Sequence, residues 1–432
     1  MLKTSDLIII GSGPGGYRAA DYAAKNGLQV IVIEESHAGG TCLNCGCIPT
    51  KSLCHDAELA GYGLPVDFPR IMQRKQQVIE QLRQGVETLL SQPNITLVRG
   101  KASFKDSKTI VVNQDEYQAK HIIIATGSHA VMPASIEGIQ QPNVLSSTEL
   151  LDIDHIPQRL CIIGAGVVGM EFASIFNSFG SEVVVVEFMK ECLPNMDADI
   201  AKRLRKCLEK RGIKFYLQSG VKKIDGKQVV FDCKGKENTI EADTILVATG
   251  RGANVDGLCL DAIGMEYSRK GIMVDDNMLT NIPNIYAIGD VNGRQMLAHA
   301  ATFQGFRAVN HILGKADNIR FDIMPAAVFT SPEAACVGLT ESYCKENGVP
   351  FTCHKGYYRA NGKALAMEAV EGMVKLLTNE DGVIIGCHIY GAHASDLVQE
   401  IAALMNHDTT LERLHDIIHA HPTLEEILQE IN

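Results

Sequence analysis

Short apolar runs occur along the chain, and each ends at a glycine or an acidic residue. The runs 7–10 and 30–33 flank a helical stretch, and the runs 160–163 and 183–186 flank a second stretch of the same design. Continuous apolar runs of this length between helical stretches are typical of parallel strands buried on both faces. The pattern therefore predicts an α/β fold in which a strand–helix–strand repeat occurs twice.

The turn after the first strand of each repeat is rich in glycine. Each turn reads Gly-x-Gly-x-x-Gly, and an acidic residue follows at the same offset in both repeats. These residues are Gly11, Gly13, Gly16 and Glu34 in the first repeat, and Gly164, Gly166, Gly169 and Glu187 in the second. Such a turn lets the backbone approach a pyrophosphate, and the acid can accept a hydrogen bond from a ribose hydroxyl. We therefore expect two Rossmann-like dinucleotide-binding domains, the alternative being two turns that are merely tight.

The acid of the second repeat affects the choice between NAD and NADP. A carboxylate at Glu187 would repel the 2′-phosphate of NADP, which favours NAD at this site. Lys190 follows closely and could attract that phosphate instead. For Glu34 and Glu187 alike, the alternative is a solvated charge at the end of a strand.

Later segments predict further elements. They are an amphipathic helix at 69–90, a strand ending in an acid at 281–290, strands at 373–377 and 383–390, and helices at 395–406 and 410–418. After about residue 321 the sequence pattern changes to that of alternating strands. This change indicates a separate α+β domain.

Composition and charge exclude several classes of partner. The net charge is −11 and no run of Lys or Arg occurs, which argues against nucleic acid because phosphate contacts need clustered cations. No apolar stretch of about 18 residues occurs, so no membrane span is predicted. The run 7–10 is too short for the core of a signal peptide, so we expect a cytoplasmic protein. In that reducing compartment a disulfide would be catalytic rather than structural.

A cluster of cysteines gives the strongest local signal. The segment 39–51 reads Gly-Gly-Thr-Cys-Leu-Asn-Cys-Gly-Cys-Ile-Pro-Thr-Lys and begins soon after Glu34, which places it beside the first nucleotide. Cys42 and Cys47 can close a short ring, and a helix that starts here would stabilise a thiolate. Cys45 leaves two alternatives open, half of a zinc site or three structural cysteines, although no second Cys/His cluster of matching spacing occurs.

The segment 40–51 resembles the active-site signature of the class I pyridine-nucleotide disulfide oxidoreductases. The resemblance covers nearly the whole chain. Residues 280–290 are similar to the family's second FAD motif, and residues 329–333 to the start of its interface domain. Residues 419–426, His-Ala-His-Pro-Thr-Leu-Glu-Glu, resemble the terminal motif of the dihydrolipoyl dehydrogenases within that family. The segment 52–100 is more compact than in typical relatives.

The resemblance implies FAD in the first repeat, NAD in the second, and no metal. It assigns an FAD-binding domain to residues 1–145, an NAD-binding domain to 146–258, a second FAD-binding or central segment to 259–320 and an α+β dimerisation domain to 321–432. Besides the glycines and acids of the two turns, the implied FAD-binding residues are Thr41, Lys51, Gly127, Asp290 and Ala298, and Gly250 is added to the NAD site.

The resemblance also implies catalytic roles. Cys42 would exchange disulfides with the substrate, and Cys47 would face the flavin. Lys51, one helical turn beyond Cys47, would lie beside flavin N5 with Glu171 as its partner. The alternative for Lys51 and Glu171 is an ordinary charge on a helix.

His421 is the best candidate for a general base among the 14 histidines, because a histidine can take a proton from a thiol near neutral pH. Glu426 would orient it. However, residues 423–426 also fit a capping box in which Glu426 only accepts a backbone N–H. The resemblance favours the catalytic pairing and implies a cis bond between His421 and Pro422. His419 is expected to be a packing or surface residue.

The expected reaction is the oxidation of a dihydrolipoyl group to its disulfide, with NAD⁺ as the final acceptor. The resemblance implies a homodimer in which each site takes its base from the partner subunit. The expected partners are a small or protein-bound dithiol and the components of a 2-oxoacid dehydrogenase or glycine cleavage complex. One alternative is an NAD(P)H-dependent reductase of another disulfide, similar to glutathione reductase. The other is a zinc-binding protein without enzymatic activity.

Overall fold

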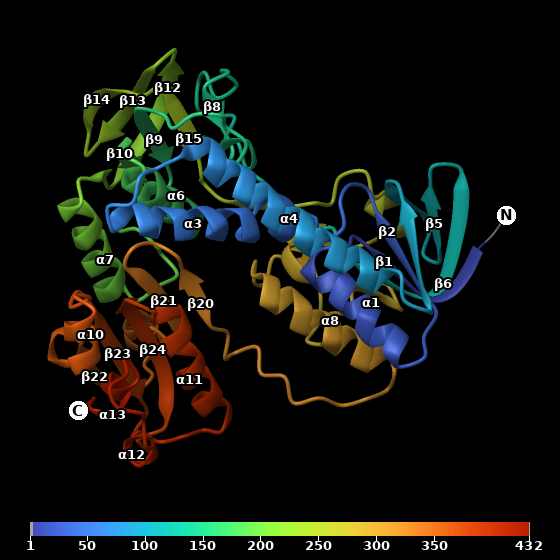
Figure 1. Ribbon diagram of the computed structural model, residues 1–432. Coiled ribbons are helices and arrows are strands. Elements are labelled where there is room, and N and C mark those ends of the chain that lie inside the picture. Colours follow the sequence, from blue (N-terminus) through green and yellow to red (C-terminus); the bar gives the residue numbers. More distant parts are fainter. Residues whose placement is uncertain (1–2, 432) are drawn as a thin grey trace. The chain divides into compact units, whose positions relative to one another are not determined.

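The apolar runs of the sequence form the central strands of two parallel sheets. The computed structural model describes residues 3–431 (Figure 1). One compact unit comprises the chain up to Ser52, Met72–Val131 and Gly250–Ile319, and the other comprises Leu53–Ile71, Met132–Thr249 and the chain from Arg320 onward. The last segment of the first unit therefore follows the second nucleotide fold in the sequence.

The first unit is built on a seven-stranded sheet of order β3-β2-β1-β6-β5-β4, in which β19 also pairs with β6. The parallel strands are β1 (Lys3–Ile10), β2 (Val30–Glu34), β3 (Ile95–Arg99), β6 (Asp115–Ile124) and β19 (Ile285–Ala287), and the antiparallel ones are β4 (Ala102–Asp106) and β5 (Thr109–Val112). Helices α1 (Pro14–Lys25) and α8 (Ala298–Ile312) pack against each other beside this sheet. The strand residues Ile8, Ile31 and Ile122 are buried in one core, as the apolar runs require.

The chain leaves and re-enters this unit through a short ribbon. Strands β7 (Ser128–Ala130) and β16 (Arg251–Ala253) pair antiparallel, one directly after each Ala-Thr-Gly sequence. The smaller elements that follow the return are the 3₁₀ helices η1 (Leu260–Ile263) and η2 (Gly289–Asn292), and strands β17 (Tyr267–Ser268) and β18 (Gly271–Ile272).

The second nucleotide fold repeats this design with a five-stranded parallel sheet of order β11-β10-β9-β15-β8. Its strands are β8 (Val144–Leu145), β9 (Arg159–Ile163), β10 (Glu182–Val186), β11 (Lys214–Tyr216) and β15 (Thr244–Val247), and its helices are α5 (Ser147–Leu150), α6 (Val167–Ser178) and α7 (Ala198–Lys210). A three-stranded antiparallel sheet, made of β12 (Ser219–Asp225), β13 (Gln228–Cys233) and β14 (Lys236–Glu241), shares its core. The duplication seen in the sequence is therefore confirmed as two dinucleotide-binding folds.

The C-terminal domain is α+β, as predicted. Its antiparallel sheet has the order β20-β21-β24-β23-β22, with β20 (Ala326–Val328), β21 (Glu333–Gly338), β22 (Thr352–Tyr357), β23 (Met373–Thr378) and β24 (Ile384–Gly391). Helix α11 (Ala394–Asn406) packs on the face that carries Val374, Leu376 and Ile389. The remaining helices are α9 (Glu341–Asn347), η3 (Tyr358–Ala360), α10 (Gly362–Ala366), α12 (Leu411–His415) and α13 (Glu426–Gln429).

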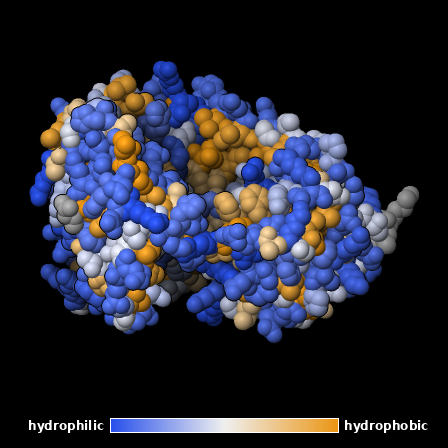
Figure 2. Space-filling model, turned by 90° about the horizontal axis from the view of Figure 1, so that it is seen from below, coloured by the Kyte–Doolittle hydropathy of each residue, from blue (hydrophilic) through white to orange (hydrophobic). Residues whose placement is uncertain are grey.

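The cysteine run lies on two consecutive helices, α2 (Gly40–Cys45) and α3 (Cys47–Gly61), and the amphipathic segment forms α4 (Phe68–Leu90). Within residues 3–431, no helix is both long and apolar enough to cross a membrane. The face seen in Figure 2 is mainly hydrophilic and is interrupted by apolar patches.

Two predicted elements are shorter than expected. In the segment 281–290 only β19 is a strand, because Pro283 lacks an N–H group and Asn284 adopts a left-handed conformation with φ 66°. The helix predicted at 410–418 ends at His415. Its last turn tightens into i→i−3 hydrogen bonds, such as the one from Ile417 N–H to Leu414 O, and the chain then turns away.

Candidate active site

The first glycine turn leaves room for a phosphate at the start of α1. A Cβ at Gly11 would lie 2.4 Å from the Ala125 oxygen, and one at Gly16 would lie 2.0 Å from the Gly11 oxygen, so neither position tolerates a side chain. Gly13 precedes α1, and no atom of the described chain lies within 4 Å of the point that a Cβ on this residue would occupy. The first N–H groups of α1 therefore face space that a pyrophosphate fits.

The second glycine turn repeats this geometry at the start of α6. A Cβ at Gly164 would lie 2.5 Å from the Ala248 oxygen, and one at Gly169 would lie 2.0 Å from the Gly164 oxygen. The space around Gly166 is open to the same extent within residues 3–431. The chain therefore offers two phosphate cradles, one in each nucleotide fold, and both fit a dinucleotide.

Both acids are buried, so neither is a solvated charge at a strand end. Glu34 is 8% exposed and accepts hydrogen bonds from the N–H group and the hydroxyl of Ser12, at 2.8 and 2.7 Å. Glu187 is 7% exposed and accepts one from the Ala165 N–H at 2.5 Å. Each carboxylate is thus attached to its own glycine turn, where it can still accept from a ribose hydroxyl. Lys190 is exposed on the loop after Glu187.

The cysteine helix α2 lies directly against the first glycine turn. Gly40 has φ 61°, and a Cβ there would come within 2.7 Å of the Gly13 Cα. The Gly39 N–H also donates to the Ser12 oxygen at 3.0 Å. The side chain of Asn44 donates to the Gly40 oxygen at 2.8 Å, which fixes the short helix internally. The structure therefore brings the thiols beside the first cradle, as the sequence predicts.

The two thiols of the signature differ in their surroundings. Cys47 is exposed and is the first residue of α3, whereas Cys42 is partly buried within α2. A side-chain hydrogen bond to Cys47 and burial raise the pKa of Cys42 well above its ordinary value, and the charge of Lys51 opposes this only in part. The helix N-terminus stabilises a thiolate at Cys47. Cys42 is therefore the thiol that keeps its proton.

The other predicted flavin contacts are partly brought together in the first unit. Asp290, in η2, accepts a hydrogen bond from the Ser128 hydroxyl at 2.5 Å. Arg251 donates to that hydroxyl and to the Ser128 oxygen, both at 2.7 Å. Sequence reasoning missed Ser128 and Arg251, although each directly follows an Ala-Thr-Gly sequence and this shared position was a usable signal.

The remaining predicted positions all belong to the first unit, including Gly250, which the resemblance assigns to the NAD site. Gly127 and Gly250 have φ 72° and 139°, Thr41 is exposed on α2, and Ala298 is the first residue of α8. The Thr302 hydroxyl, one turn further along α8, donates to the Pro14 oxygen at 3.4 Å. The start of α8 therefore lies near the first glycine turn.

Lys51 and Glu171 are not brought together within one unit. Lys51 lies on α3 in the first unit, and Glu171 lies on α6 in the second. Glu171 is 3% exposed and accepts a hydrogen bond from the Phe329 N–H at 3.0 Å. It is therefore no ordinary surface charge, while its pairing with Lys51 stays a prediction.

His421 and Glu426 form the expected pair in the C-terminal domain. His421 Nδ1 lies 2.9 Å from Glu426 Oε1, and the Thr423 N–H donates to Glu426 Oε2 at 2.9 Å. Glu426 thus makes both of the contacts weighed from the sequence, one to the histidine and one to a backbone N–H. The Thr423 hydroxyl has no partner in the described part of the chain, so the capping box is only half formed. The expected cis bond between His421 and Pro422 is present. The side chain of His419 is 7% exposed and contacts Glu400.

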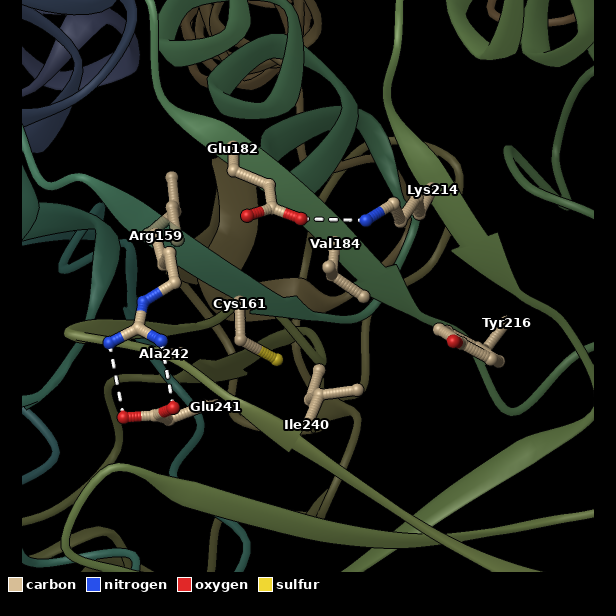
Figure 3. A pocket seen from close by; sticks show the side chains of 10 residues that line it. Arg159, Cys161, Glu182, Val184, Lys214, Tyr216, Ile240, Glu241 and Ala242 are labelled. Atoms are coloured by element: carbon tan, nitrogen blue, oxygen red, sulfur yellow. Dashed lines mark hydrogen bonds and ion pairs between the residues drawn. The ribbon is translucent and has the colours of Figure 1, made fainter.

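A pocket of about 250 Å³ lies at the amino edge of the second nucleotide sheet, which is the edge opposite the second glycine turn (Figure 3). Arg159 pairs there with Glu241 at 2.8 Å, and Glu182 pairs with Lys214 at 2.6 Å. Burial raises the pKa of Cys161 to about 12, so this thiol stays protonated. The charges of this pocket are already paired, and the glycine turn lies at the carboxyl edge of the sheet. The pocket is therefore separate from the nucleotide site.

The described residues do not contain the group of ligands that the zinc alternative requires. Across residues 3–431, no three His, Cys, Asp or Glu side chains are grouped as a metal ion would require. Cys42, Cys45 and Cys47 are therefore not arranged as a zinc site.

Two dinucleotide cradles, with a thiol pair beside the first of them, define a flavin- and nicotinamide-dependent disulfide oxidoreductase. The family profile described as "Pyridine nucleotide-disulphide oxidoreductase" matches residues 5–305, and the dimerisation-domain profile of that family matches residues 324–431. The chain belongs to the pyridine nucleotide-disulphide oxidoreductase family. It is a flavoprotein enzyme that uses FAD and NAD and carries the family's dimerisation domain.

The relatives of this chain are named for different activities. Dihydrolipoyl dehydrogenase of Chlamydia muridarum is 38% identical to this chain over 100% of the chain and 96% of that protein. Leghemoglobin reductase of Glycine max is 39% identical over 99% of the chain and 86% of that protein. The solved Cu(II) complex of the HOCl-induced flavoprotein disulfide reductase RclA from Escherichia coli superposes with a TM-score of 0.91 at 30% identity, covering 99% of this chain and 98% of that one.

Proposed function

We propose that the protein is a dihydrolipoyl dehydrogenase, which oxidises a dihydrolipoyl dithiol to its disulfide and passes the electrons to NAD⁺. The observation that carries this proposal is the hydrogen bond between His421 and Glu426, on a segment that resembles the terminal motif of dihydrolipoyl dehydrogenases. The 38% identity with the dihydrolipoyl dehydrogenase of Chlamydia muridarum supports it.

His421 would act as the base. A carboxylate can only accept, so Glu426 fixes the proton on Nδ1 and leaves Nε2 to take a proton from a substrate thiol. The His421 side chain is 80% exposed, which makes it accessible. Hydrogen bonds from the Thr423 N–H and from His421 lower the pKa of Glu426. The carboxylate therefore stays ionised and stabilises the imidazolium that forms.

The thiol–disulfide exchange between the substrate and the cysteine pair takes place in two steps. The deprotonated substrate thiol attacks Cys42 in the Cys42–Cys47 disulfide, so a mixed disulfide forms at Cys42 and Cys47 leaves as a thiolate. The second substrate thiol then attacks the substrate sulfur of the mixed disulfide. Cys42 leaves and takes up the proton held by His421, which then accepts the proton of the second substrate thiol and releases it to water. The substrate is oxidised by two electrons, and the cysteine pair is reduced by two.

FAD supplies, when bound, the two-electron chemistry that connects the reduced thiols with NAD⁺. Cys47, at the start of α3, is the thiolate that would meet it, and Asp290 would hold its ribitol. Lys51 would lie beside flavin N5. Glu34 and Glu187 would accept from the adenosine ribose of FAD and NAD, respectively.

We further propose a cytoplasmic homodimer in which each site takes His421 from the partner subunit. The dithiol would be free or carried on a protein of a 2-oxoacid dehydrogenase or glycine cleavage complex.

A steady-state assay tests the proposal directly. Turnover of dihydrolipoamide with NAD⁺ should exceed turnover of glutathione disulfide with NADPH by orders of magnitude. The reverse ranking would reject the dehydrogenase and leave a reductase of another disulfide. The likeness to RclA, a disulfide reductase, is the observation that favours this second candidate.

A further inference from the structure

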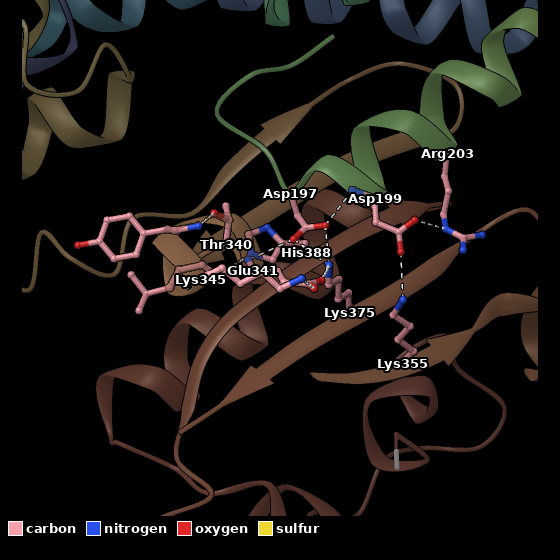
Figure 4. A network of polar contacts seen from close by, with 11 residues as sticks. Asp197, Asp199, Arg203, Thr340, Glu341, Lys345, Lys355, Lys375 and His388 are labelled. Carbon is pink, nitrogen blue, oxygen red and sulfur yellow. Dashed lines mark hydrogen bonds and ion pairs between the residues drawn. The ribbon is translucent and has the colours of Figure 1, made fainter. Parts of the chain in front are cut away.

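A buried lysine of the C-terminal sheet contacts the first turn of α7. Lys375 of β23 has a side chain that is 1% exposed, and its Nζ lies 2.8 and 2.9 Å from the two oxygens of Asp197 (Figure 4). The same Nζ lies 2.5 Å from Glu341 Oε2. Burial by itself lowers the pKa of Lys375, but hydrogen bonds to Asp197 and Glu341 outweigh it and raise the pKa. The lysine is therefore charged, and it is held by two carboxylates.

Asp197 connects two domains of the second unit. It is the N-cap of α7, where it accepts a hydrogen bond from the Asp199 N–H at 3.0 Å, and its side chain is 2% exposed. It also accepts from the Glu341 N–H of the C-terminal domain at 3.3 Å. The start of a helix of the nucleotide fold is thus fixed by residues of the C-terminal domain.

The segment 188–197, here called the nucleotide loop, joins β10 to α7 and begins directly after Glu187. The Leu193 N–H donates to the Ala165 oxygen of the glycine turn at 2.9 Å. At the other end, Phe188 is 75% exposed beside the acid. The loop is therefore fastened to the glycine turn at Leu193 and to Lys375 at Asp197.

We propose that Lys375 is a positioning residue for the NAD site. Through Asp197 it fixes the end of the nucleotide loop, and through the loop it holds the glycine turn and Glu187 in the geometry that binds adenosine diphosphate. Without Lys375, Asp197 would be a buried carboxylate that has lost its cation, and the start of α7 would move towards water. This inference rests on the proposed placement of NAD at Glu187.

The substitution Lys375→Met tests the proposal, because methionine resembles the lysine stem but carries no charge. The probe is ADP-ribose, which contains the pyrophosphate and adenosine of NAD but cannot exchange electrons. We expect its Kd for the FAD-loaded enzyme, measured by calorimetry, to rise about tenfold or more. Reduction of the flavin by dihydrolipoamide without NAD⁺ should keep its rate, since that half-reaction does not use the NAD site.

Lys355→Met is the matched control. Lys355 also comes from the C-terminal sheet and pairs with the first turn of α7, at 3.1 Å from Asp199 Oδ2, but its side chain is 35% exposed and does not contact the N-cap. Its removal should change the Kd by less than about twofold. An equal rise in both variants would overturn the proposal, because any loosened ion pair would then have the same effect.

A second variant covers the case in which Lys375→Met does not fold. Asp197→Asn keeps a good N-cap but removes the charge that pairs with Lys375, so it should raise the Kd as well. An unchanged Kd in a folded Lys375→Met protein, or in Asp197→Asn if the former fails to fold, overturns the proposal. If wild type does not bind ADP-ribose, or if Glu187→Ala does not weaken its binding, the placement of NAD itself is wrong.

Discussion

Cys42 and Cys47 are close in sequence, but their surroundings differ in a way that supports the different roles proposed for them. Cys42 is partly buried and hydrogen-bonded to its partner, which raises its pKa, whereas Cys47 starts a 15-residue helix. The proton therefore rests on Cys42, and the thiolate forms at Cys47. This asymmetry suits an enzyme in which one sulfur exchanges with substrate and the other passes electrons to a flavin.

The substitution Cys42→Ser should leave Cys47 as a lone thiolate against oxidised flavin. A long-wavelength charge-transfer band should appear in the absorption spectrum, and dihydrolipoamide turnover should fall by at least about a hundredfold. Cys45→Ser is the matched control, because Cys45 lies in the same short helix but outside the proposed Cys42–Cys47 disulfide, and it should retain activity and lack the band. Most of the activity surviving in Cys42→Ser would show that the roles are wrongly assigned.

Glu187 should make the enzyme prefer NADH over NADPH. Its carboxylate is buried and attached to the glycine turn, so it can accept from a 2′-hydroxyl but repels a 2′-phosphate. We expect kcat/KM for NADH to exceed that for NADPH by roughly tenfold or more, and Glu187→Gln to narrow the gap. A preference for NADPH in wild type would contradict the assignment and indicate Lys190 as the phosphate ligand.

At the scale of elements, helix α2 depends on a glycine contact. Gly40 has φ 61°, and a Cβ there would lie 2.7 Å from the Gly13 Cα. Gly40→Ala should therefore cost roughly 1–2 kcal/mol of backbone strain and displace α2 from the phosphate cradle. We expect weaker FAD retention, measured as released flavin fluorescence during thermal unfolding. Gly85→Ala, at a helix position with open space around it in the described chain, is the control and should retain FAD.

The sequence predicts elements well where a periodic pattern meets a turn signal. The two glycine turns, their acids and the strands 7–10 and 160–163 are visible because the repeat occurs twice, and α/β layering follows from it. Local chain geometry is less visible: the segment 281–290 contains a strand of only 3 residues, which begins after Asn284 with its left-handed conformation. Tertiary contacts are not visible, since Lys375 meets Asp197 only after two domains have folded.

The same limit applies to the active site. His421 and Glu426 are five residues apart, so their pairing can be predicted from a motif, and the structure contains it at 2.9 Å. Ser128 and Arg251 are linked in the sequence only by the Ala-Thr-Gly that precedes each, and no pattern connects either of them with Asp290. Side chains that come from distant segments and meet only in the folded chain are therefore the part of a site that sequence reasoning misses first.

At the scale of the whole molecule, the family's dimerisation domain carries the proposed base. Residues 324–431 match this domain. His421 lies within it, and its side chain is exposed. Cys42 and Cys47 lie in the first unit. In the proposed dimer each site combines the thiols of one subunit with the base of the other, so a monomer would lack a complete site, and a two-fold symmetric dimer would contain two.

Hybrid dimers test this sharing. Cys42→Ser and His421→Ala proteins should each be nearly inactive, because every site of either homodimer lacks one essential group. In a hybrid of the two, one site combines the intact Cys42 of one chain with the intact His421 of the other. Random pairing makes about half of all dimers hybrids with one restored site of two, so about a quarter of wild-type dihydrolipoamide activity should return.

If thiols and base came from the same chain, every site of the hybrid would lack one of them. A hybrid verified by two different affinity tags that shows no recovery would therefore reject the shared site, and with it the catalytic role of the C-terminal domain across the dimer.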